Sequence, residues 1–207
     1  MKHCNYLKTI VIVHGKSEYQ MCSFIKSELR LQMEILARNN GKSSIQITSL
    51  MKFLKHNKCT SSLKNFKNEL GDSLPIDNKG KIIIPDDLKI FTIMDTDDCT
   101  QKQKNSYIAK EMFEDFWCKD YIFPIYNILN LEDVLKKSKI KYKKKHPEDQ
   151  KKEYVEIFPT ETKYKQNSTK IDLIEFQDNL SKCPNTNMEH FIAHCLEEAK
   201  NNPYFKN

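Results

Sequence analysis

Short runs of β-branched and aromatic residues recur along the chain, separated by longer stretches with helical spacing. The runs at residues 8–13, 88–94 and 121–126 are typical of strands that are buried on both faces of a sheet. Apolar residues at intervals of three and four follow these runs and indicate amphipathic helices. Because strands and helices alternate through about residue 126, the sequence predicts βαβ units around a mostly parallel sheet.

The first helix and the segment after it can be bounded from their capping and turn residues. Ser17 and Gln20 stand in the relation of a capping box, so we expect a helix that begins at Glu18. Its apolar stripe continues until residues 39–41, where the sequence Asn-Asn-Gly is expected to end the helix. Alternating residues at 44–48 then predict a short strand.

Caps and prolines bound the elements in the rest of the chain. Ser49 is expected to cap a helix, and Gly71 is expected to close the next one in a left-handed conformation. Residues 81–84 predict a short edge strand, because prolines flank the segment. Apolar stripes at 171–180 and 186–199 predict two C-terminal helices.

Composition limits the class of protein. The chain has 207 residues, of which 39% are hydrophobic and 30% charged, as suits one globular core with a small appendage. No apolar run is long enough to span a membrane and no signal peptide precedes the first strand, so we expect a cytoplasmic protein without membrane contact. Seven cysteines without a close C-x-x-C pair argue against a disulfide framework and a zinc site.

The formal net charge of +6 favours anionic partners, and lysines are concentrated after residue 135. Two interpretations of the lysine-rich run at 136–152 remain open. It is either a solvated, mobile face or an arm that contacts phosphates through Lys143, Lys144 and Lys145. The predicted organisation is a core at 1–135, this insertion or arm at 136–170, and C-terminal helices at 171–207 that pack on the core.

Polar residues follow two of the predicted strands directly. The strand at 8–13 ends in His14-Gly15-Lys16-Ser17-Glu18, and the strand at 88–94 ends in Asp95-Thr96-Asp97-Asp98. Binding sites of parallel α/β sheets lie at the carboxyl ends of strands. Three carboxylates within four residues repel one another unless a cation, a proton or water separates them, which points to a hard divalent metal ion. An acidic turn that caps the next helix is the alternative.

The order of these two motifs resembles that of the Toprim domain of topoisomerases, primases and overcoming-lysogenization-defect (OLD) nucleases. In that family the first motif is Glu-Gly-x-x-Glu and the second is Asp-x-Asp. The chain is most similar to the small RloB-like and OLD-like Toprim proteins of bacterial defence systems, over residues 8–135. Asn130-Leu131-Glu132 also resembles the acidic position that those proteins carry after the fourth strand. The resemblance implies a Toprim-like, Rossmann-like α/β fold.

The resemblance implies metal-dependent hydrolysis of phosphodiester bonds in DNA or RNA, with Mg²⁺ or Mn²⁺ as cofactor. Glu18, Asp95 and Asp97 would hold the metal, and Asp98 and Glu132 could complete the shell of a second ion. Gly15 would let the backbone turn sharply under the substrate. Lys16 either contacts the substrate phosphate or is a solvated lysine of the loop. A role in defence against phage or mobile elements also follows from the resemblance alone. Whether the protein has an ATPase partner protein or forms a homo-oligomer stays open.

One position departs from the family pattern. His14 stands where the family has its first glutamate, which is assigned to metal binding or acid/base work. An imidazole binds Mn²⁺ and other transition ions better than it binds Mg²⁺, so activity is expected either to persist with an altered metal preference or to be lost. Two rivals therefore remain: a decayed, nucleic-acid-binding or sensor subunit, and a haloacid-dehalogenase-like phosphatase that uses Asp95 as nucleophile and Asp97 as acid/base.

Overall fold

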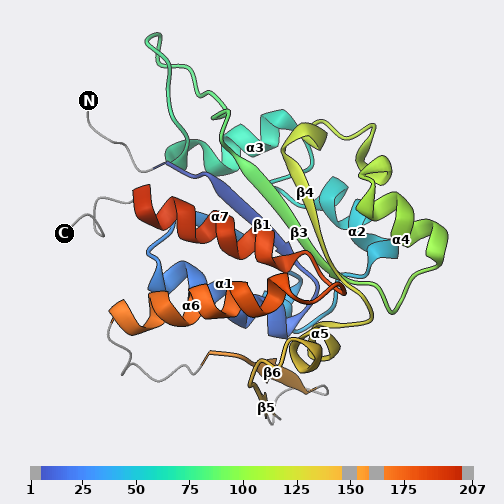
Figure 1. Ribbon diagram of the computed structural model, residues 1–207. Coiled ribbons are helices and arrows are strands. Elements are labelled where there is room, and N and C mark those ends of the chain that lie inside the picture. Colours follow the sequence, from blue (N-terminus) through green and yellow to red (C-terminus); the bar gives the residue numbers. More distant parts are fainter. Residues whose placement is uncertain (1–5, 146–152, 159–165, 202–207) are drawn as a thin grey trace.

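A four-stranded parallel sheet forms the centre of the computed structural model, which describes residues 6–145, 153–158 and 166–201 (Figure 1). The strands in this sheet follow the order β2-β1-β3-β4. They are β1 (Thr9–Val13), β2 (Met33–Leu36), β3 (Lys89–Asp95) and β4 (Ile122–Asn127). All three pairings are parallel, which confirms the predicted α/β class with a parallel sheet.

Helices cover both faces of the sheet (Figure 1). One face carries α1 (Lys16–Glu28), α5 (Leu131–Lys137), α6 (Gln166–Ser181) and α7 (Met188–Asn201). The other face carries α2 (Ile47–His56), α3 (Leu63–Leu70) and α4 (Gln101–Ile108). Alternate strand residues enter the two cores, Val11 and Val13 on the first face and Ile10 and Ile12 on the second. This two-sided burial explains why the strands are continuous apolar runs.

The predicted long first helix is wrong in both of its boundaries. Helix α1 begins two residues earlier than expected, at Lys16, and ends at Glu28. Arg30 adopts a left-handed conformation (φ 48°) just after it, and the chain turns into β2, which pairs with β1. The apolar spacing misled because Met33 and Leu36, the buried ends of a four-residue strand, also stand three apart, as on a helix.

Four other local predictions are also wrong. The expected strand at 44–48 is a turn that leads into α2, and Ile45 N–H donates to the His14 carbonyl at 2.7 Å. Gln46 rather than Ser49 is the N-cap of α2. Gly71 lies in the right-handed helical region (φ −55°) because a 3₁₀ turn continues directly from α3. Residues 81–84 make only one isolated bridge, between Ile76 and Ile82.

The lysine-rich segment forms a small hairpin beside α5 (Figure 1). Strand β5 (Lys143–Lys145) pairs antiparallel with β6 (Tyr154–Glu156), and residues 146–152 of the predicted arm lie outside the described residues. The two expected C-terminal helices are confirmed as α6 and α7. Helix α7 packs on β3 through Phe191, whose ring contacts the Phe91 ring edge-on with the ring centroids 5.2 Å apart. The domain boundaries at 135 and 170 stay predictions.

Two findings bear on the composition. Among the described residues, no helix combines the length and apolar character needed to cross a bilayer. The described cysteines are all free thiols, as expected, and Cys4 lies outside this part of the chain.

Candidate functional site

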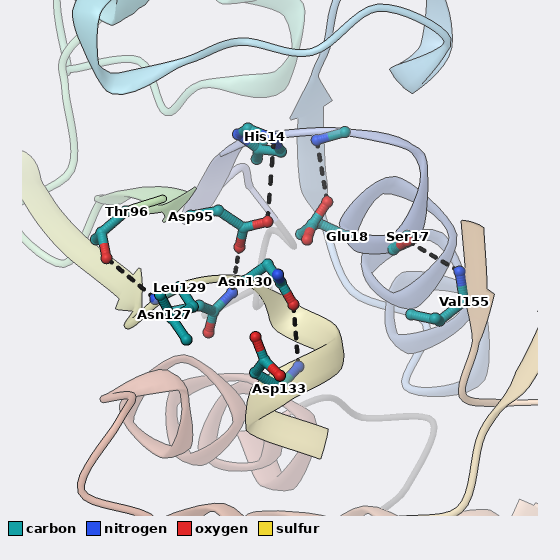
Figure 2. A network of polar contacts seen from close by, with 11 residues as sticks. His14, Ser17, Glu18, Asp95, Thr96, Asn127, Leu129, Asn130, Asp133 and Val155 are labelled. Carbon is teal, nitrogen blue, oxygen red and sulfur yellow. Dashed lines mark hydrogen bonds and ion pairs between the residues drawn. The ribbon is translucent and has the colours of Figure 1, made fainter. Parts of the chain in front are cut away.

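The two sequence motifs meet at one edge of the sheet because β1 and β3 are adjacent and parallel. Val13 pairs with Ile93, and the His14 N–H continues the ladder by donating to the Ile93 carbonyl at 2.9 Å. His14 and Asp95 therefore leave the carboxyl ends of neighbouring strands side by side (Figure 2). The His14 Nε2 and Asp95 Oδ2 atoms are 4.0 Å apart.

Glu18 reaches the same place from the first turn of α1. Gly15 is the N-cap of this helix, and the Glu18 carboxylate folds back to accept the Gly15 N–H at 3.0 Å. This bond satisfies one of the free donors at the start of a helix and holds the carboxylate over the turn (Figure 2). Glu18 is only 2% exposed. The capping box thus uses Glu18 itself, not the expected pair Ser17 and Gln20.

A hydrogen-bond network fixes the orientation of Asp95. Asn127, at the end of β4, donates through Nδ2 to Asp95 Oδ1 at 3.0 Å (Figure 2). The Thr186 hydroxyl lies 3.0 Å from Asn127 Oδ1 and holds the amide in turn. The C-terminal segment before α7 therefore supports the Asp95 side chain through one intermediate residue.

Burial dominates the electrostatics of the two carboxylates. Asp95 is 7% exposed, and this burial raises its pKa well above the ordinary value, with the neighbouring Glu18 charge raising it further. Burial also raises the pKa of Glu18, partly offset by the nearby His14. Two buried carboxylates that interact with each other are costly when both are ionised without a cation. The pair therefore favours either a shared proton or a bound positive ion.

These side chains line a cavity of about 460 Å³. Its lining comes from the β1–α1 turn (residues 14–18), the loop after β2, Asp95 at the end of β3, the start of α5 (130–132) and the hairpin residues 144 and 153–155. Three further segments, the loop after β2, the start of α5 and the hairpin, thus surround the turn and Asp95. Of the predicted site residues, the cavity brings together His14, Gly15, Lys16, Glu18, Asp95, Glu132 and Lys144.

The other two acidic residues of the second motif do not line this cavity. Asp97 is exposed, although its charge contributes to the raised pKa of Asp95. Asp98 is half-buried, and one of its carboxylate oxygens is buried without a hydrogen-bond partner. Burial raises the pKa of Asp98, while the charge of His14 opposes the shift. The Asp98 carboxylate therefore lies near enough to His14 for the two charges to interact.

Glu132 lies at the cavity but is engaged by cations of the chain. Its Oε1 atom is 3.0 Å from Lys144 Nζ and 3.2 Å from Lys136 Nζ, and it accepts the Tyr142 hydroxyl at 3.2 Å. The bond to Lys144, above all, lowers the pKa of Glu132. This carboxylate is ionised at neutral pH and anchors the hairpin to α5.

The three predicted phosphate-contacting lysines of β5 separate into two groups. Lys144 lines the cavity and lies between Glu132 and Glu153, 3.6 Å from the latter. Lys145 pairs with Glu156 at 3.2 Å and does not line the cavity, and Lys143 is exposed outside it. This division follows from the alternation of side chains along a strand.

The glycine that the local packing requires is Gly41, not Gly15. Gly15 has an extended backbone, and a Cβ there would lie at an ordinary 3.6 Å from Glu18 Oε2. At Gly41 (φ 83°) a Cβ would lie 2.9 Å from the Lys16 Cα atom, so this loop packs tightly against the start of α1.

Several residues of the site were missed from the sequence. Gly41, Lys42 and Ser44 line the cavity from the loop after β2, in a region where a helix end and a strand were expected. The signal that could have revealed this loop is the Asn39-Asn40-Gly41 run, because all three residues adopt positive φ angles. Asn127 was also missed, although an amide at the end of the strand next to β3 indicates a partner for Asp95.

The residues at the cavity have the donor types that suit a divalent ion. The His14 Nδ1 atom is buried without a hydrogen-bond partner, and two carboxylates lie beside the ring (Figure 2). Nitrogen together with carboxylate oxygen is a donor set for Mn²⁺ and other transition ions. Within the described residues, however, no three histidine, cysteine, aspartate or glutamate side chains are arranged to hold a metal ion as they stand. Binding would therefore need side-chain rotation.

Comparison with protein-family models, with curated proteins and with solved structures finds no significant match to this chain.

Proposed function

We propose that the protein is a metal-dependent nuclease of the Toprim type, which hydrolyses phosphodiester bonds in DNA or RNA. The observation that carries this proposal is the meeting of His14, Glu18 and Asp95 in one cavity at the carboxyl ends of adjacent parallel strands. Glu18 and Asp95 stand 77 positions apart in the sequence and come from the two motifs that resemble the family's pair.

Glu18, Asp95 and His14 would hold the cation, in keeping with the buried pair of carboxylates. A divalent ion at this place would activate a water molecule and neutralise charge on the phosphate in the transition state. Its positive charge would also replace the proton that burial otherwise favours on the carboxylate pair. Asn127 would keep Asp95 in position during turnover through its 3.0 Å hydrogen bond.

The cavity also carries cationic groups for an anionic substrate. Lys16, Lys42 and Lys144 line it on three different segments. Lys16 is the first residue of α1, where the positive end of the helix dipole adds to its charge. With the net charge of +6, this distribution favours a polyanion such as nucleic acid. A defence role remains an expectation from the family resemblance, and a cytoplasmic location remains an expectation from the apolar pattern of the sequence. An ATPase partner and a homo-oligomer remain open.

The direct test is cleavage of supercoiled plasmid and of tRNA by the purified protein with Mg²⁺, Mn²⁺ or EDTA. We expect metal-dependent cleavage that is lost in Asp95→Ala and in Glu18→Ala. Asp87→Ala is the matched control, since Asp87 is an exposed carboxylate before the opposite end of β3. Circular dichroism checks that all three variants fold. Unchanged cleavage by the first two variants would refute the site.

A second candidate function is a binding or sensor subunit whose catalytic centre has decayed. Two observations favour it: histidine at position 14, and the lack of a ready three-ligand group among the described residues. This candidate predicts nucleic-acid binding that weakens steeply with salt, together with no cleavage under either metal ion. Cleavage that appears in a His14→Glu variant but not in the natural protein would identify the decayed residue.

A further inference from the structure

The β5–β6 hairpin forms one wall of the cavity, and specific contacts hold it there. The Val155 N–H donates to the Ser17 hydroxyl at 3.0 Å, which joins the hairpin to the first turn of α1 (Figure 2). Val155 itself is 5% exposed and packs in the core of that face of the sheet. A second contact is the ion pair between Lys144 and Glu132 of α5, at 3.0 Å. The hairpin is thus fixed to both helices that flank the acidic pair.

A second wall of the cavity is the loop after β2, and this loop packs against the start of α1. Gly41 packs against the backbone of Lys16 so closely that a Cβ at this position would lie 2.9 Å from the Lys16 Cα atom. The Ile45 N–H donates to the His14 carbonyl and ties the end of the loop to the strand that carries the site. The carboxylates of Glu18 and Asp95 lie between the two walls and are almost fully buried.

The size of this cavity and the burial of its carboxylates restrict the substrate. A volume of about 460 Å³ is in the range that holds a single small ligand. A paired duplex is stiff, and its two strands move together. It therefore cannot bend enough to bring one of its phosphates to the buried carboxylates. An unpaired nucleotide is flexible enough to enter, and enzymes that act at a buried site on nucleic acid take the target nucleotide out of the duplex.

We propose that the site takes an unpaired nucleotide strand, with the hairpin as the wall that excludes duplex and Lys144 as the residue that contacts the entering phosphate. The choice of a phosphodiester rests on the proposed function, whereas the preference for an unpaired strand rests on the two walls. Lys144 suits this contact because it lines the cavity with a side chain that is 47% exposed, so a phosphate can replace Glu132 or Glu153 as the partner of its ammonium group.

Binding in EDTA separates this inference from cleavage. Fluorescence anisotropy is measured with a labelled 12-nucleotide strand, as DNA and as RNA, and with the blunt duplex of the same sequence. A mononucleotide serves as competitor. We expect the single strand to bind at least about tenfold more tightly than the duplex. We also expect Lys144→Ala to weaken single-strand binding several-fold and to lower the slope of log affinity against log salt by about one.

The chain offers a matched control for each variant. Lys145→Ala removes the same charge one residue away on the hairpin but outside the cavity, and should change single-strand affinity less than twofold. Ser17→Ala loosens the hairpin and should lower the preference for single strand over duplex. Ser23→Ala on the same helix should leave that preference unchanged, because within the described part of the chain its hydroxyl bonds only the Tyr19 carbonyl.

Each outcome decides one of the two proposals. Equal binding of duplex and single strand, tight binding of the mononucleotide alone, or equal effects of Lys144→Ala and Lys145→Ala would overturn the inference, whether or not the protein cleaves. A clear single-strand preference without cleavage under any metal ion would support the inference and reject the nuclease.

Discussion

Replacing Asp95 by asparagine separates the effect of the Asp95 charge on stability from its effect on metal binding. The side chain is buried, accepts a hydrogen bond from Asn127 at 3.0 Å and lies 4.0 Å from the His14 ring. Asparagine has nearly the same shape and keeps an oxygen for Asn127 but carries no charge. In the absence of metal, the variant no longer places a second ionisable carboxylate beside Glu18.

The expected change in stability follows from two opposing effects. Relief of an incompletely compensated buried polar group stabilises the fold by about 1–3 kcal/mol. Replacing a charge-assisted hydrogen bond to Asn127 by a neutral one costs about 0.5–1 kcal/mol. We therefore expect Asp95→Asn to increase the free energy of unfolding by about 1 kcal/mol in EDTA at pH 7. For a chain of this length, that is an increase of about 2–4 °C in Tm.

The pH dependence of this difference has a fixed sign. Because burial raises the pKa of Asp95, the native protein holds a proton there that the unfolded chain releases more easily. Lowering the pH from 7 toward the ordinary aspartate range therefore stabilises the natural protein relative to Asp95→Asn. The advantage of the variant should shrink as the pH falls.

Divalent metal should reverse the order of the two proteins. An ion that binds only the native state adds about 2.7 kcal/mol at a concentration 100 times its Kd. Thermal unfolding in EDTA and in Mn²⁺, at pH 7 and pH 5, measures all of these effects, with Asp87→Asn as the exposed control. The reasoning is refuted if Asp95→Asn is less stable than the natural protein in EDTA, or if Mn²⁺ stabilises both equally.

Three further predictions concern other parts of the chain. Gly41→Ala should lower the free energy of unfolding by about 2 kcal/mol or more in urea titrations, since it combines a positive φ with a backbone clash. Gly80→Ala should cost only the penalty of the positive φ, about 1–2 kcal/mol, because no atom lies near its Cβ position. Equal losses of stability in the two variants would contradict this prediction. His14→Glu should shift cleavage from Mn²⁺ toward Mg²⁺, measured as the ratio of initial rates, and an unchanged ratio would exclude the imidazole as a ligand. Burial lowers the pKa of His194 to about 4. The stability contributed by its neutral form should therefore be lost as the pH falls from about 6.5 toward 4. Over that range the urea midpoint of His194→Gln should fall less than the urea midpoint of the natural protein.

The sheet and the meeting of the two motifs could be predicted because they depend on strong, simple signals. Continuous β-branched runs identify buried strands, and parallel pairing alone brings the ends of β1 and β3 to one edge. The segment at 33–36 could not be assigned, because a short strand with two buried ends has the same apolar spacing as one helical turn.

Other parts of the site depend on contacts between distant residues and leave no local signal. The bond between Val155 and Ser17 joins positions 138 apart, and nothing in the lysine-rich composition indicates that β6 packs on α1. Lys144 and Lys145 are indistinguishable in the sequence, yet only the first lines the cavity. The departure at position 14 is visible in the sequence, but the sequence does not show that the ring lies beside two buried carboxylates.

The central claim is that Glu18 and Asp95 share one divalent cation, and crystals of the protein soaked in Mn²⁺ test it most directly. The account predicts an anomalous scattering peak at the manganese absorption edge roughly 2.2 Å from carboxylate oxygens of both residues, which is absent in Glu18→Gln crystals. A bound manganese ion elsewhere on the protein, with no peak in this cavity at saturating metal, would contradict it.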